Sequence, residues 1–139
     1  MKRRVARGRK DLHNAPVFDS SVVLAVLYEE VGNHQLVDYL REGLLSSVNL
    51  LEVHTKLLLN GLPADLAWRQ INGLQLEICP LDVEQARIAS EMIWKTRPYG
   101  LSLGDRACLA LAVQRRAMVY TADRVWSEIP LGVKIEVIR

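Results

Sequence analysis

Residues 101–123 read LSLGDRACLALAVQRRAMVYTAD, and this stretch indicates the fold of the chain. From Leu101 onward, apolar residues recur at the spacing of a buried helix face, and Asp105 is the acid on that face. The run AMVYT at 117–121 is typical of a short buried strand, and Asp123 follows it closely. Because an unpaired carboxylate inside a protein is strongly unfavourable, Asp105 requires a compensating partner that a leucine would not need.

Strands and helices alternate along the rest of the chain. The segments expected to form further strands are short and apolar: 16–19, 44–47, 76–81 and 133–138. The segments expected to form further helices are 20–30, 34–43, 48–61, 63–74 and 82–97. Ser20 or Ser21 is expected to cap the first of these helices. The alternation indicates an α/β fold, a three-layer α/β/α sandwich with a mostly parallel central sheet.

The charge of the chain is concentrated at its start. Six of the 18 basic residues lie within residues 1–10, where there is no acid, although the net charge of all 139 residues is only +2. We therefore expect a flexible basic leader over residues 1–15 and a single domain over residues 16–139. Two interpretations of the leader stay open: an arm that binds nucleic-acid phosphates, or a solvated segment.

The remaining composition favours a soluble cytoplasmic protein. The apolar runs are far too short to span a membrane, and no apolar segment typical of a signal peptide follows the basic start. Cys79 and Cys108 lie within apolar stretches without metal-ligand spacing, so we expect both to be buried free thiols in a reducing compartment.

Four acids lie where strands end or where the following helices begin: Asp19, Glu52, Asp105 and Asp123. Ligand sites of open α/β sheets form just outside the carboxyl ends of the strands, so these carboxylates are expected to lie near one another. Crowded like charges repel and need a positive group to neutralise them. A ligand set made only of carboxylate oxygens suits Mg²⁺ or Mn²⁺.

Each acid also has a simpler interpretation. Asp105 could complete a capping box with Ser102 at the start of its helix. Glu52 could form a surface ion pair with Lys56 one turn later. Asp19 and Asp123 could be ordinary turn residues. These alternatives stay open from the sequence alone.

Four blocks around the acids resemble the PIN-domain nucleases, in order and with similar spacing. The blocks are VFDSSVVLAVLYEE (17–30), LLSSVNLLEV (44–53), LSLGDRACLALA (101–112) and VYTADRVW (119–126). The resemblance covers roughly residues 16–138 and is greatest to the VapC toxins of type II toxin–antitoxin pairs. A departure from that pattern is the fifteen residues before the first strand, whose role the resemblance does not explain.

The resemblance implies a Mg²⁺- or Mn²⁺-dependent endoribonuclease that acts on RNA, forms a homodimer and is held inactive by a cognate VapB-like antitoxin. The residues that match the acidic quartet of the family are Asp19, Glu52, Asp105 and Asp123. Thr121 matches a hydroxyl residue that assists the site. We expect Asp19 and Asp105 to be the principal metal ligands, and Glu52 and Asp123 to act through water or at a second ion.

Several other residues invite functional interpretations. Arg106 and Arg124 each adjoin an acid of the quartet and could contact RNA phosphates, or could be solvated. The tryptophans at positions 68, 94 and 126 are expected to serve packing or interfaces rather than base stacking.

Two other functions are compatible with this outline. A phospho-acceptor receiver domain also gathers acids at the edge of a parallel sheet, although Asp19 is followed here by serines rather than by an acid. A PIN-like domain that only binds its partner would keep the fold without catalysis. RNA cleavage that depends on Mg²⁺ and stops in EDTA would separate the nuclease from both.

Overall fold

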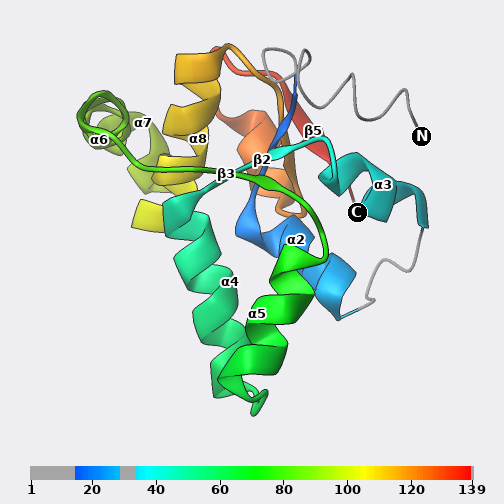
Figure 1. The fold of residues 1–139 in the computed structure, drawn as a ribbon. Helices are drawn as coiled ribbons and strands as arrows, with labels where there is room; N and C mark the ends of the chain where they lie inside the picture. Colours follow the sequence, from blue (N-terminus) through cyan, green and yellow to red (C-terminus); the bar gives the residue numbers. More distant parts are fainter. Residues whose placement is uncertain (1–14, 29–33, 139) are drawn as a thin grey trace.

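A central parallel sheet organises the computed structural model, which describes residues 15–28 and 34–138 (Figure 1). Residues 1–14 of the expected leader, and the end of the helix expected over 20–30, lie outside the described residues. The strands are β1 (Val17–Phe18), β2 (Leu44–Ser46), β3 (Glu77–Cys79), β4 (Val119–Thr121) and β5 (Ile135–Val137). They pair in the order β3-β2-β1-β4-β5, and every pairing is parallel. The predicted parallel sheet is therefore confirmed.

Helices cover both faces of this sheet. The helices are α2 (Ser20–Leu27), α3 (His34–Leu40), α4 (Ser47–Leu59), α5 (Ala64–Asn72), α6 (Val83–Glu91), α7 (Ile93–Thr96) and α8 (Leu103–Arg115), with the 3₁₀ turns η2 (Arg97–Tyr99) and η3 (Arg124–Glu128). Their arrangement gives the three layers predicted from the alternation of elements (Figure 1).

The core divides into two layers because consecutive strand residues point to opposite faces. Val17 and Leu44 pack with the apolar face of α8 and with Trp126, which is fully buried. Their neighbours Phe18 and Leu45 pack with the apolar residues of α2, α3, α4 and α5. Ala15, the last residue of the expected leader, is also buried in the layer of α8.

The starts of two helices differ from the expectation. The helix expected from Leu101 begins at Leu103, because Ser102 is its N-cap and accepts a hydrogen bond from the backbone N–H of Asp105. Neither Ser20 nor Ser21 caps α2: the N-cap is Asp19, whose side chain makes no capping hydrogen bond. The carboxylate of Asp19 is thereby left to a different set of partners.

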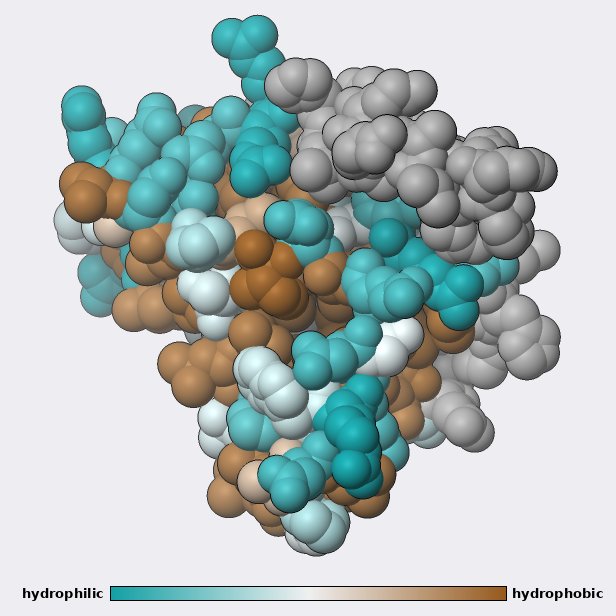
Figure 2. Space-filling model, viewed as in Figure 1, coloured by the Kyte–Doolittle hydropathy of each residue, from teal (hydrophilic) through white to brown (hydrophobic). Residues whose placement is uncertain are grey.

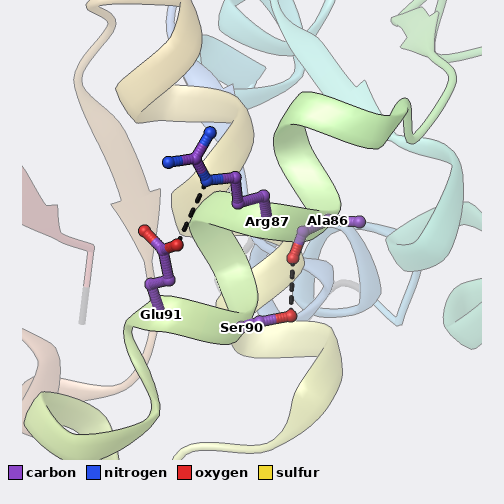
Figure 3. Close-up of polar contacts among 4 residues, drawn as sticks. All are labelled: Ala86, Arg87, Ser90 and Glu91. Carbon is purple, nitrogen blue, oxygen red and sulfur yellow. Dashed lines mark hydrogen bonds and ion pairs between the residues drawn. The ribbon is translucent and has the colours of Figure 1, made fainter.

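The helix expected over 82–97 is interrupted near Met92 and ends in the turn η2. Hydroxyl side chains that donate to a carbonyl of the preceding turn bend helices. Here Ser90 Oγ donates to the carbonyl of Ala86, next to the exposed ion pair of Arg87 with Glu91 (Figure 3). Pro98 also removes a backbone donor at the end of this segment. The prediction of a single long helix over 82–97 was therefore wrong.

Strand order separates this fold from one of the two alternatives. Receiver domains have the order 2-1-3-4-5, whereas the order here is β3-β2-β1-β4-β5. The receiver interpretation is thereby excluded. Among the described residues, no helix is both long and apolar enough to cross a membrane.

Candidate active site

All four acids of the predicted quartet line one pocket at the carboxyl edge of the sheet. The helices α2 and α4 leave this edge, and α8 begins there (Figure 1). The pocket has a volume of about 550 Å³. The acidic residues in its wall are Asp19, Glu52, Asp105 and Asp123. Because they come from four separate segments, the fold brings together carboxylates that are distant in sequence.

Asp19 is the most deeply placed of these acids. It directly follows the central strand β1, and only 2% of its surface is exposed. Its Oδ2 accepts hydrogen bonds from the hydroxyls of Ser21 at 2.6 Å and Thr121 at 2.7 Å. Burial, with a contribution from the charge of Asp105, raises the pKa of Asp19 from 3.8 to about 6, although both hydroxyls oppose this rise. The ionised form of Asp19 is therefore held at an energetic cost.

Hydrogen bonds also connect Asp19 to the loop after β4. Thr121 Oγ1 donates to Asp19 and accepts from the backbone N–H of Asp123 at 3.1 Å. Ser21 Oγ donates to Asp19 and accepts from the backbone N–H of Ala122 at 3.0 Å. The two hydroxyls therefore fix the carboxylate of the first acid and the backbone of the fourth in one arrangement.

Asp105 combines the two interpretations that the sequence left open. Its Oδ2 accepts the backbone N–H of Ser102 at 2.9 Å, so the capping box is present. The half-buried carboxylate also lines the acidic pocket. Burial raises the pKa of Asp105, the bonds from Ser102 oppose that rise, and the charges of Glu52 and Asp123 add to it. One side chain thus begins the helix and faces the other acids.

A specific contact between α4 and α8 positions Glu52. Its Oε1 accepts a hydrogen bond at 2.9 Å from the side-chain amide of the buried Asn49, which also donates to the carbonyl of Gly104 at 3.1 Å. A Cβ atom at position 104 would lie 2.0 Å from Oε2 of Glu52. Glycine at this position therefore leaves the space that the Glu52 carboxylate occupies.

The ion pair between Glu52 and Lys56, which the sequence left open as an alternative, is not formed. Both residues are described by the structure and no salt bridge joins them, whereas Arg87 and Glu91 form one at 3.1 Å. Both Glu52 and Lys56 line the pocket, but the contacts with Asn49 and Gly104 hold the carboxylate instead. A local helix contact was therefore displaced by a tertiary one.

The two arginines beside the quartet lie outside the pocket wall. Arg106 Nη1 donates to the carbonyl of Ala89 at 2.9 Å, which ties α8 to α6. Arg124 is exposed at the start of η3. Among the tryptophans, Trp126 is in the core as expected, whereas Trp68 and Trp94 are 43% and 73% exposed. The interface role suggested for the last two stays a prediction.

Both cysteines are buried free thiols, as expected. Burial raises the pKa of the Cys108 thiol well above its usual value, and the charges of three quartet acids raise it further. Cys108 therefore lies beneath the acidic pocket as an uncharged packing residue.

The donor chemistry of the pocket is that of a site for a hard cation. Carboxylate and hydroxyl oxygens from the quartet, Ser20, Ser21 and Thr55 line it, without histidine or cysteine. In the part of the chain that the structure describes, no three Asp, Glu, His or Cys side chains converge tightly enough to form a metal-ligand cluster. The acids therefore share a pocket without adopting a closed ligand cage.

Three residues that support the acids were not predicted from the sequence: Ser21 as a partner of Asp19, and both Asn49 and Gly104. Ser21 follows Asp19 by two residues at the start of α2, which is a detectable local signal. Asn49 precedes Glu52 by three residues, so its place on the same helix face was also predictable. The contact with Gly104 spans 55 residues and has no local signal.

Comparisons with known proteins agree with this arrangement. The PIN domain family profile matches residues 17–131. A search of curated protein sequences gives no significant match. Among solved structures, the DNA-bound VapBC complex of Salmonella typhimurium matches 89% of this chain and 98% of its own, with a TM-score of 0.73 and 17% identity.

Two further solved structures have the same fold. VapBC2 of Rickettsia felis, bound to a promoter DNA fragment, matches 88% of this chain and 97% of its own, with a TM-score of 0.71 and 13% identity. VapBC-5 of Mycobacterium tuberculosis matches 89% and 97%, with a TM-score of 0.57 and 21% identity. At these identities the structures establish the fold, while the family profile spans most of the sequence. The chain therefore belongs to the PIN-domain family.

Proposed function

We propose that this protein is a metal-dependent endoribonuclease that hydrolyses RNA phosphodiester bonds and acts as the toxin of a toxin–antitoxin pair. The observation that carries the proposal is the convergence of four carboxylates from four segments on one pocket. Like charges repel, so such a group is favourable chiefly when a cation neutralises it. Burial is the main cause of the raised pKa values of Asp19 and Asp105, and the charges of neighbouring acids of the quartet add to both.

The residues of the pocket fit Mg²⁺ or Mn²⁺. The donors are hard oxygens, and PIN domains generally use divalent metal ions. The buried amide of Asn49 donates to Glu52 from behind the pocket wall, and its Oδ1 has no hydrogen-bond partner. We assign Asp19 and Asp105 as the principal ligands, and Glu52 and Asp123 as ligands through water or at a second ion.

When bound, the ion supplies an activated water and neutralises charge on the phosphate oxygens. The protein contributes the orientation of its own carboxylates. Ser21 and Thr121 both donate to Oδ2 of Asp19, which fixes the plane of that carboxylate. Asn49 and the space at Gly104 hold Glu52 in the pocket.

The toxin assignment rests on the family and on the kind of assembly in which its fold recurs. The matched structures from Salmonella typhimurium, Rickettsia felis and Mycobacterium tuberculosis are named as VapBC complexes or systems. We infer that this chain likewise has a VapB-like antitoxin partner that suppresses its activity, and that it forms a homodimer.

The test is RNA cleavage by the purified full chain in Mg²⁺, in Mn²⁺ and in EDTA, with mixed RNA as substrate. We expect internal cleavage in either metal and none in EDTA. Asp19→Asn and Asp105→Asn are each expected to abolish cleavage, while Asp38→Asn, an exposed acid on α3, retains it.

Thermal melts accompany the cleavage assay. They are needed because the remaining alternative is that this chain is a PIN-like domain that binds a partner without catalysis. Mg²⁺ should raise the melting temperature of the wild type but not that of Asp19→Asn. If RNA stays intact in Mg²⁺ and Mn²⁺ with the protein folded, the nuclease proposal fails. Equal cleavage by the wild type and both quartet variants would reject the proposed site.

A further inference from the structure

Lys56 is the single basic side chain among the described residues that line the acidic pocket. It lies on α4 one helical turn after Glu52, and it is exposed. An ion pair at this spacing would neutralise both groups. Instead, Asn49 and the space at Gly104 hold the Glu52 carboxylate, so the ammonium of Lys56 stays available.

An apolar rim adjoins this ammonium. Leu51 and Leu59 are 65% and 78% exposed and line the same pocket. Together with Thr55 they follow the i, i+4, i+8 spacing of one helix face. We call Leu51, Thr55, Lys56 and Leu59 the α4 stripe. Apolar side chains also reach the surface at the lower end of the view in Figure 2, where α4 and α5 lie in Figure 1.

The α4 stripe has the chemistry to hold a ligand that is anionic at one point and apolar next to it. Single-stranded RNA alternates a charged phosphate with a base and ribose that carry apolar faces. A strand cleaved at the carboxylates continues beyond the pocket wall, and the α4 stripe is part of that wall. Lys56 is then the cation that a neighbouring phosphate meets.

We propose that Lys56 binds the RNA phosphate next to the one that is cleaved, while Leu51 and Leu59 contact the nucleoside between them. The α4 stripe thereby sets how the strand lies across the four carboxylates. This inference rests on the proposed nuclease function and assigns a substrate-positioning role to a residue outside the acidic quartet.

The first measurement separates binding from turnover. Steady-state cleavage of a single-stranded oligoribonucleotide in Mg²⁺ is compared for the wild type, Lys56→Gln and Lys56→Arg. The control Lys95→Gln removes the same charge from the exposed face of α7. We expect Lys56→Gln to raise KM about tenfold with little change in kcat, as for removal of one charge-assisted hydrogen bond. Lys56→Arg should restore KM, because arginine also binds phosphate.

Salt dependence gives a second signature in the same variants. A lysine that neutralises one phosphate contributes about 0.7 to the slope of log kcat/KM against log KCl, so this slope should be flatter by that amount in Lys56→Gln. The slope of Lys95→Gln should match that of the wild type.

The third measurement does not depend on catalysis. The full chain is treated with an amine-acylating reagent in EDTA, with and without the same oligoribonucleotide at saturating concentration, and each lysine is read by mass spectrometry. We expect the RNA to slow acylation of Lys56 and to leave Lys95 unchanged.

The outcomes distinguish the two proposals. A wild type that leaves the oligoribonucleotide intact in Mg²⁺ rejects the nuclease function, and the positioning role falls with it. A wild type that cleaves RNA while Lys56→Gln matches Lys95→Gln in KM and salt slope overturns the role of Lys56 alone. Unchanged acylation of Lys56 in that cleaving protein would do the same, and would leave the leucines of the α4 stripe to a protein partner.

Discussion

Asp19→Asn should stabilise the metal-free protein at neutral pH. The wild-type carboxyl is buried, and its pKa rises from 3.8 to about 6. A raised acid pKa means that the native state binds protons more tightly than the unfolded chain. The contribution of Asp19 to the free energy of unfolding is therefore fully present below pH 3.8 and is lost as the pH rises through 6. At about 1.4 kcal/mol per pH unit, the ionised Asp19 costs the native state roughly 3 kcal/mol above pH 7.

Asparagine removes this cost and keeps the geometry. Its amide oxygen can accept the hydrogen bonds from Ser21 and Thr121 in the place of Oδ2. We therefore expect the free energy of unfolding of Asp19→Asn to exceed that of the wild type by up to about 3 kcal/mol at pH 8. The difference should shrink toward zero near pH 4, where the native wild-type carboxyl is protonated.

Urea unfolding in EDTA from pH 4 to pH 8, followed by tryptophan fluorescence, measures this difference, because Trp126 is fully buried. Asp38→Asn, an exposed acid, is the control and should track the wild type at every pH. Added Mg²⁺ should reverse the order, since an ion that binds the native state stabilises the wild type by mass action. If Asp19→Asn is no more stable than the wild type at pH 8, or if the difference ignores pH, burial does not strain this carboxylate.

Three further changes test other parts of the site. Gly104→Ala should leave the melting temperature unchanged or higher, because alanine favours helix, but should lower RNA cleavage at least tenfold by displacing Glu52. The control is Gly73→Ala, whose Cβ would meet no atom closer than 3.4 Å. Full activity in Gly104→Ala would show that the new Cβ does not displace Glu52. Asp105→Asn should not lower the melting temperature in EDTA, because it removes a charge that burial and the neighbouring acids disfavour. A lower melting temperature in Asp105→Asn, with no effect of Mg²⁺ on either protein, would show that Asp105 serves only as a helix cap. Deleting residues 1–10 removes six positive charges and should flatten the salt slope of RNA binding by about 0.7 for each RNA phosphate that these residues neutralise, and equal slopes for both proteins would show that this segment does not touch RNA.

Much of the fold and the position of the acids could be predicted because both depend on local patterns. Apolar runs separated by helices determine a parallel sheet, and residues that end its strands meet at one edge. That rule alone placed Asp19 and Asp123 beside Asp105. The hydroxyl of Thr121, expected from the family resemblance, lies between the first and fourth acids.

The remaining features depend on tertiary contacts or on a competition between local effects. Glu52 and Lys56 have the spacing of an ion pair, but the amide of Asn49 and the missing side chain of Gly104 decide where the carboxylate lies. From the sequence, helix capping and a place in the acidic pocket are alternative roles for Asp105. In the structure the same carboxylate caps the helix and lines the pocket.

The strand order has a consequence for when the pocket of four acids is complete. Central strand β1 lies between β2 and β4, and the hydrogen bond from Thr121 to Asp19 joins positions 102 residues apart. Contacts of such long sequence separation form late, because a large loop must close first. A growing or truncated chain that lacks β4 has three of the four acids but neither Asp123 nor the hydroxyl that fixes Asp19. The complete pocket can therefore form only after the chain has been made through β4 and Asp123.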